Sequence, residues 1–204
     1  AQARSTGRRR VREVVDASAL GLGELTYSVH AEGFWQVHVD APRVLVERVV
    51  RGALGENLEG AAGSRVLELY SGAGLFTLPL AALVGNGGEV LSLEGNEQAV
   101  RDARRTLHDH PAARLASGRV SARSVRELAA SFTGGRPDVV VLDPPRQGAG
   151  REVIEAVGAL GAERIVLVAC DPAALARDLG TLLRAGYALG SMSALDMFPH
   201  THHF

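Results

Sequence analysis

Lysine is absent from this sequence of 204 residues, so all 22 side chains counted as Lys or Arg are arginines. Without lysine, neither a P-loop that holds phosphates nor Schiff-base catalysis is available. Cysteine occurs once, as Cys170, which excludes an internal disulfide and a multi-cysteine metal or cluster site. Aromatic residues make up 4% of the chain, and no apolar run is long enough to cross a membrane. We therefore expect a cytoplasmic protein that needs neither a membrane nor a metal.

The net charge is also small, with a formal value of −1 at pH 7. The overall charge therefore gives no argument for nucleic-acid binding. Five arginines nevertheless crowd the first dozen residues: Arg4, Arg8, Arg9, Arg10 and Arg12. Such a cluster can follow phosphates, but a solvated linker is the more common explanation. We interpret residues 1–24 as an N-terminal linker and residues 25–204 as one domain, since the length and the 46% hydrophobic content suit a single α/β core.

The sequence is organised around the stretch from Arg65 to Thr77, an apolar run that ends in a glycine-rich turn and continues as an apolar helix. Gly72 and Gly74 let the backbone approach a ligand, which is typical of a nucleotide-type site, although a tight turn between strand and helix is the plain structural explanation. A dinucleotide site would need a third glycine where Thr77 stands. Glu94 ends the next predicted strand, where a carboxylate can bind the ribose of a dinucleotide or of S-adenosylmethionine.

Alternating strand and helix patterns predict an α/β, Rossmann-like fold with a mainly parallel, seven-stranded sheet and helices on both faces. The predicted strands are residues 25–29, 66–70, 89–93, 119–123, 138–142, 164–169 and 187–195. The first predicted helix begins after an N-cap at Asp40 and ends near Leu54. The other predicted helices cover residues 74–84, 96–108, 124–130, 150–159 and 172–185. Ligands bind such sheets at the carboxyl ends of the strands. The candidate positions there are Tyr70 to Leu75, Glu94, Ser124, Asp143 to Arg146, and Cys170 to Pro172.

A rigid turn follows the apolar run 139–142 and consists of Asp143, Pro144, Pro145 and Arg146. A turn that only reverses the chain does not need both a carboxylate and a guanidinium, so we interpret this turn as functional. An amine-directed methyltransferase also places an acidic or amide residue before two prolines, but it then needs an aromatic residue where Arg146 stands. Amino methylation is therefore disfavoured.

Cys170 ends the apolar run 165–169, and Asp171 and Pro172 can cap and open the next helix. Unpaired N–H groups at a helix N-terminus favour a thiolate, whereas the charge of Asp171 opposes it. A lone cysteine is most often a small buried apolar residue. Its place at the end of a strand makes a nucleophile the better hypothesis here.

Two further segments are ambiguous. Histidines at positions 200, 202 and 203 lie close together, but they lack partners at a recognised ligand spacing, so we expect no metal. Aromatic residues gather at Phe34 and Trp35 beside polar neighbours. They fit a ligand site and a plain core equally well.

Five segments together resemble the RNA 5-methyluridine methyltransferase family, which acts on uracils of tRNA and 23S rRNA. They are Gly33-Phe34-Trp35-Gln36-Val37-His38, the turn from Leu67 to Phe76, Asp143-Pro144-Pro145-Arg146, the segment from Cys170 to Leu179, and Asp196-Met197-Phe198-Pro199-His200-Thr201. The resemblance covers residues 25–204, and the last two segments are the most specific. It implies a class I methyltransferase fold and an enzyme that transfers a methyl group from S-adenosylmethionine to C5 of uridine in tRNA or rRNA.

The resemblance also implies a chemistry. A cysteine thiolate, here Cys170, adds to C6 of uracil and makes C5 nucleophilic, and a base later removes the C5 proton so that the cysteine can leave. The family's substrate-side arginine corresponds to Arg146. The residues that correspond to cofactor contacts are Gln36, Tyr70, Gly72, Glu94 and Asp143.

The sequence departs from the family pattern at several positions. Ser71 stands where a cysteine is common, His38 and Asp171 stand where asparagines are common, and Leu75 replaces a residue that is sometimes polar. The family's general-base glutamate would fall just beyond Phe204. Its N-terminal RNA-binding barrel and iron–sulfur cysteines have no counterpart here, so we expect a catalytic-domain fragment.

Three alternatives stay open at this point. A cytosine-C5 RNA methyltransferase would use the same cysteine chemistry. A cofactor-binding module without activity would share the fold. A nicotinamide oxidoreductase would share the glycine turn, but the absence of the third glycine disfavours it.

Overall fold

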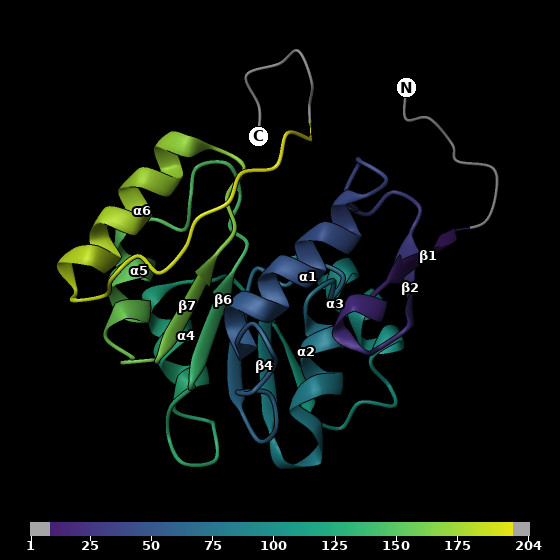
Figure 1. The fold of residues 1–204 in the computed structure, drawn as a ribbon, viewed down its shortest axis with the longest axis horizontal. Helices are drawn as coiled ribbons and strands as arrows, with labels where there is room; N and C mark the ends of the chain where they lie inside the picture. The colour runs from purple at the N-terminus through teal and green to yellow at the C-terminus, as the bar shows by residue number, and fades with distance from the viewer. Residues whose placement is uncertain (1–8, 198–204) are drawn as a thin grey trace.

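The computed structural model describes residues 9–197, which form a five-stranded parallel sheet covered by helices and a separate two-stranded hairpin (Figure 1). The strands are β1 (Arg10–Asp16), β2 (Glu24–His30), β3 (Arg65–Leu69), β4 (Glu89–Glu94), β5 (Ala113–Ser117), β6 (Val139–Leu142) and β7 (Arg164–Leu167). The helices are α1 (Ala41–Leu54), α2 (Thr77–Val84), α3 (Glu97–Thr106), α4 (Ala122–Ala129), α5 (Arg151–Gly158) and α6 (Pro172–Arg184), with short 3-10 turns at Ser18–Leu20 and Gly85–Gly87. No helix within residues 9–197 is long and apolar enough to cross a membrane.

The main sheet has the strand order β5-β4-β3-β6-β7, and all its neighbouring strands are parallel. Side chains alternate between its two faces. Val66 belongs to the core that α1, α2 and α3 cover, and Leu67 belongs to the core that α4, α5 and α6 cover. This two-sided burial explains why the central strands are nearly continuous apolar runs.

The chain changes direction at the middle of this sheet. It runs outward from β3 to β5 and then returns to form β6 on the other side of β3. A crevice opens beyond the carboxyl ends of the strands at such a switch point. The glycine turn after β3 and the Asp143 turn after β6 therefore lie on its two sides.

The prediction of seven strands in one sheet was wrong, because the main sheet has five. The predicted strand at residues 25–29 exists as β2, but it pairs with β1 in the separate hairpin. The predicted strand at 187–195 is not one, since these residues have no regular structure. This segment contains Gly190, Ser191 and Ser193, which pack poorly on a sheet.

The predicted strand at 119–123 was also wrong, because β5 lies earlier, at Ala113–Ser117. β5 is an edge strand without a continuous apolar run, so hydrophobicity alone did not reveal it. Ser121 instead caps α4, and Ser124 completes a reciprocal capping box with it. Ser124 is therefore a helix-capping residue.

The hairpin of β1 and β2 is attached to α3 through Asp102, whose side chain is 2% exposed. Its oxygens accept hydrogen bonds from the Arg10 guanidinium at 2.6 Å, the His30 backbone N–H at 2.8 Å and the Gln98 amide at 3.0 Å. No strand was predicted at β1, because arginines interrupt its apolar pattern. Arg10 nevertheless has a defined structural partner.

Helix α1 follows the predicted amphipathic pattern, since Val46, Val49, Val50 and Ala53 are buried. Pro42 lies in its first turn as predicted. Asp40 occupies the N-cap position, but its side chain makes no capping hydrogen bond. The predicted start of the helix was right and the predicted capping contact was wrong.

Candidate active site

A large cleft lies at the carboxyl edge of the main sheet and has a volume of about 2110 Å³. A pocket for one small molecule usually measures about 300–1,000 Å³. The cleft therefore has room for a cofactor together with a nucleotide. All the predicted site residues line it: Gln36, Tyr70, Gly72, Glu94, Asp143, Arg146 and Cys170.

The turn after β3 forms one wall of the cleft. Tyr70 and Gly72 have left-handed backbones with φ values of 63° and 54°, and the Tyr70 N–H donates to the Leu93 carbonyl at 2.9 Å. A Cβ atom at Gly72 would meet no atom within 4 Å, so this glycine faces open space in the cleft. A Cβ at Gly74 would approach the Ala103 Cβ to 3.2 Å. Gly72 thus keeps space for a ligand, and Gly74 allows the turn to pack on α3.

Glu94 at the end of β4 is held in place by backbone N–H groups. Its Oε2 accepts from the Gly72 N–H at 2.9 Å and its Oε1 accepts from the Asn96 N–H at 2.6 Å. Each oxygen has a second lone pair that these bonds do not use. Glu94 can therefore accept hydrogen bonds from two adjacent hydroxyl groups in the cleft without a change of rotamer.

Asp143 lies at the end of β6, across the switch point from the glycine turn. Burial, and to a smaller extent the nearby charge of Glu94, raise the pKa of Asp143 to about 6. Both causes act against the charged form. A cationic ligand beside Asp143 would favour its charged form.

The loop after Asp143 carries Arg146 and is fixed by α6. The Gly148 N–H donates to the Pro145 carbonyl at 2.8 Å, and the Ala149 N–H donates to Asp178 Oδ2 at 2.7 Å. Asp178 belongs to α6 and is 5% exposed. One buried carboxylate thus connects the loop that carries Arg146 to the helix that follows Cys170.

Gly148→Ala should destabilise this connection. Gly148 has a φ of 84°, and a Cβ there would lie 2.7 Å from Asp178 Oδ2. We expect a loss of roughly 1–3 kcal/mol in the free energy of unfolding, measured by urea denaturation. Gly135→Ala is the matched control, because Gly135 has a φ of 85° and open space around its Cβ. An equal loss in both variants would show that the Asp178 contact is unimportant.

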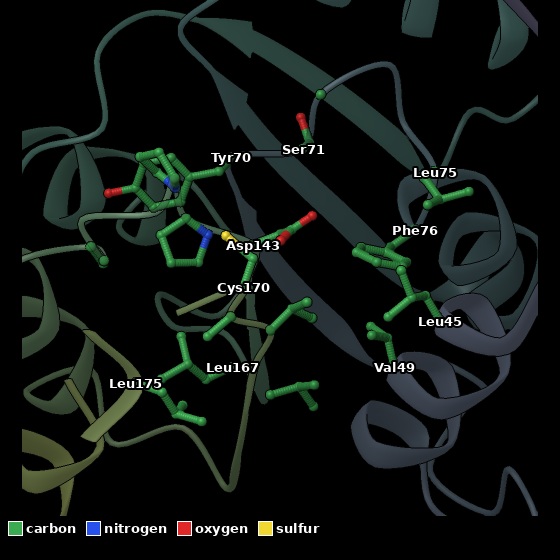
Figure 2. Close-up of a pocket in the computed structure, with 18 of the residues that line it drawn as sticks. Leu45, Val49, Tyr70, Ser71, Leu75, Phe76, Asp143, Leu167, Cys170 and Leu175 are labelled. Carbon is green, nitrogen blue, oxygen red and sulfur yellow. The ribbon is translucent and has the colours of Figure 1, made fainter. Parts of the chain in front are cut away.

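Cys170 follows β7 and is exposed in the cleft. The Asp171 side chain caps α6 by accepting from the Ala174 N–H at 2.7 Å, as the sequence predicted. Because Cys170 is exposed, the alternative of a buried structural cysteine is excluded. In Figure 2, the side chains of Tyr70, Asp143 and Cys170 gather on one side of the cleft, and Leu45, Val49 and Phe76 lie across from them.

Gln36 lies in the loop between β2 and α1 and is half-buried. The aromatic pair beside it has two different environments. Trp35 packs on Tyr27 with ring centroids 5.1 Å apart, whereas Phe34 is 77% exposed. Trp35 is thus partly buried against the core and also lines the cleft, whereas Phe34 lines the cleft and is mostly exposed.

Sequence reasoning missed three residues of this region. Arg119 and Val120 line the cleft after β5 and were hidden by the wrong strand assignment. The capping signal of Ser121 would have located them. Glu68 was overlooked as part of an apolar strand, although it is 1% exposed. A carboxylate within such a run is the signal that could have identified it.

Several predicted features lie outside the described residues. They are Arg4 and Arg8 of the basic cluster and positions 198–204, which include the three C-terminal histidines. Within residues 9–197, no group of three or more His, Cys, Asp or Glu side chains is arranged to hold a metal ion.

Comparison with known proteins identifies the family. Residues 24–204 match the profile of the tRNA (Uracil-5-)-methyltransferase family. The chain belongs to this family. An uncharacterized RNA methyltransferase of Streptomyces avermitilis is 43% identical to it over 198 residues, which are 97% of this chain and 42% of that protein. The 23S rRNA (uracil(1939)-C(5))-methyltransferase RlmD of Acinetobacter baumannii is 34% identical over 187 residues, which are 91% of this chain and 38% of that protein.

The fold agrees with a solved structure of a tRNA (uracil-5-)-methyltransferase. The tRNA (uracil-54, C5)-methyltransferase of Pyrococcus abyssi, crystallised with S-adenosyl-L-homocysteine, has a TM-score of 0.69 and 29% identity. The superposition covers 97% of this chain and 42% of that one. The α/β methyltransferase fold is thus confirmed, and the chain spans about 42% of the length of that relative.

Proposed function

We propose that this chain is the catalytic part, residues 25–204, of an S-adenosylmethionine-dependent enzyme that methylates C5 of uridine in tRNA or rRNA. The observation that carries this proposal is that the single thiol of the chain, Cys170, is exposed in the same cleft as the glycine turn and Glu94. Membership of the tRNA (uracil-5-)-methyltransferase family supports the same reaction.

The cleft fits the proposed cofactor. Gly72 leaves open space beside the backbone, and Glu94 presents fixed oxygens that suit the two hydroxyls of a ribose. Asp143 adds a carboxyl that favours a positively charged group. We assign Gln36 and Tyr70 to the same ligand, because they line the same cleft. When bound, S-adenosylmethionine would supply the methyl group.

We propose that Cys170 is the nucleophile. Its thiolate sulfur would form a bond to C6 of the uracil, and the displaced electron pair would make C5 nucleophilic. After C5 has been methylated, a base would remove the C5 proton, and the electron pair would return as the bond between sulfur and C6 breaks. Arg146, at the same edge of the cleft, would position the nucleotide.

Calorimetry with the cofactor tests the proposal directly. We expect S-adenosylmethionine to bind and NAD not to bind, because the turn lacks the third glycine of a pyrophosphate site. Glu94→Ala should weaken cofactor binding by about 1–3 kcal/mol, since hydrogen bonds to a charged group are lost. Unchanged affinity would remove Glu94 from the site.

The matched control is Glu97→Ala, three residues further along the chain. The Glu97 side chain is 79% exposed and pairs with Arg101 across 3.5 Å at the surface. This variant should bind the cofactor like the wild type. A similar loss in both variants would indicate a general charge effect and not a ribose contact.

A further inference from the structure

Glu68 is the fourth of the five residues of β3, two residues before Tyr70 at the wall of the cleft, and it is almost completely buried. Its Oε2 accepts a hydrogen bond from the Thr77 hydroxyl at 2.6 Å. Its Oε1 is buried and has no hydrogen-bond partner among residues 9–197. A buried carboxylate oxygen that lacks a donor is costly, whereas the neutral acid costs much less. The geometry of Glu68 therefore favours the protonated form.

The charged groups near Glu68 also favour its protonated form. Burial is the main reason that the pKa of Glu68 is raised, and the hydrogen bond from Thr77 lowers it in part. The charges of Asp143, at the end of β6, and Glu94, at the end of β4, add smaller increases. Tyr27 from β2 also lies nearby, and its hydroxyl donates to the Leu75 carbonyl at 2.9 Å. Together, burial and the charges of Asp143 and Glu94 raise the pKa of Glu68 to about 8.

We propose that Glu68 holds a proton in the free protein and releases it to solvent when a cationic ligand binds in the cleft. This inference rests on the proposed function, because S-adenosylmethionine has a sulfonium, an ammonium and a carboxylate group and therefore a net positive charge. Positive charge near a carboxyl favours its ionised form. A ligand cation between Asp143 and Glu94 would also offset the charges of these two groups, which add to the effect of burial on the pKa of Glu68. Binding of the cofactor and release of the proton are then coupled events.

The coupling makes cofactor affinity depend on pH. Binding that releases a proton becomes tighter as the pH rises, by up to about tenfold per pH unit for one proton. The increase should end near the pKa of Glu68, because above it the free protein has no proton left to release. Binding by Glu68→Gln should depend much less on pH. Glutamine keeps the acceptor for Thr77 but cannot ionise.

Calorimetry at pH 7.5 in buffers of different ionisation enthalpy tests the proposal on the 204-residue chain. The wild type should release about 0.5–1 proton per S-adenosylmethionine bound. Glu68→Gln should bind the same ligand and release almost none. Equal release by both proteins, or binding to the wild type without release, would overturn the inference while leaving the proposed function intact.

A neutral ligand gives a second test that does not depend on any variant. 5′-Methylthioadenosine shares the nucleoside but carries no positive charge, so its binding to the wild type should release no proton. Release with this ligand would show that occupancy, and not charge, drives the effect, and would overturn the inference. If S-adenosylmethionine itself does not bind, the proposed function fails and this inference fails with it.

Discussion

Cys170→Ala should abolish every covalent complex between this protein and uracil-containing RNA. The substitution removes the sulfur that would bond to C6, and alanine has no nucleophile to replace it. An RNA with 5-fluorouridine is the sharpest probe, because fluorine at C5 cannot be removed as a proton and the adduct should persist. Denaturing electrophoresis after incubation with S-adenosylmethionine should show a slowly migrating species with the wild type only.

Two controls make this experiment decisive. Ser191→Ala removes a hydroxyl group from the same cleft and should leave the adduct unchanged. Cys170 is exposed, so its replacement should change the free energy of unfolding by no more than about 0.5 kcal/mol. A wild-type chain that binds the RNA but forms no adduct would contradict the assignment of Cys170. An RNA with 5-fluorocytidine should form less adduct if the enzyme prefers uracil.

Glu68→Gln should make the protein more stable than the wild type above about pH 8, with a difference of roughly 2–4 kcal/mol. The pKa of Glu68 is raised from 4.5 to about 8, so the folded state binds this proton more tightly than the unfolded state. The contribution of this proton to the free energy of unfolding is complete below pH 4.5 and is lost as the pH rises through about 8. Glutamine stays neutral, so the variant avoids this loss.

Urea denaturation at a series of pH values between 5 and 9 measures the difference. The two proteins should have similar free energies of unfolding at pH 5 and should diverge as the pH rises. Glu24→Gln is the control, because Glu24 is exposed at the start of β2 and should leave the pH dependence unchanged. Parallel curves for wild type and Glu68→Gln would show that Glu68 is not protonated in the folded protein.

The central strands were predictable because strands that are buried on both faces consist of nearly continuous apolar residues. β3 and β6 are short runs of mostly apolar residues, and helices of sufficient length separate the parallel strands. The edges of the fold were not predictable in this way. β5 is only partly buried, and β1 carries Arg10, whose structural role depends on Asp102, a residue far along the chain. Only tertiary contacts reveal such partners.

The candidate site was predictable to the extent that it follows from sheet geometry. The carboxyl ends of parallel strands meet at one edge, so Glu94, Asp143 and Cys170 were expected together and line the same cleft. Their chemical roles stay predictions. Glu68 could not be found by this rule, because it lies within a strand and not at its end. Its importance comes from an oxygen without a partner among residues 9–197, which no sequence pattern displays.

The three hydrogen bonds to Asp102 have a consequence for cooperativity. If the hairpin detached from α3, the buried carboxylate would lose the Arg10 guanidinium and the His30 N–H together. A buried charge without its partners is strongly unfavourable, so partial opening has little advantage over complete opening. The two strands of the hairpin should therefore detach from α3 together, as a single unit. The loop with Gln36 starts directly after His30. One end of this loop is therefore held in place only while the hairpin stays attached to α3.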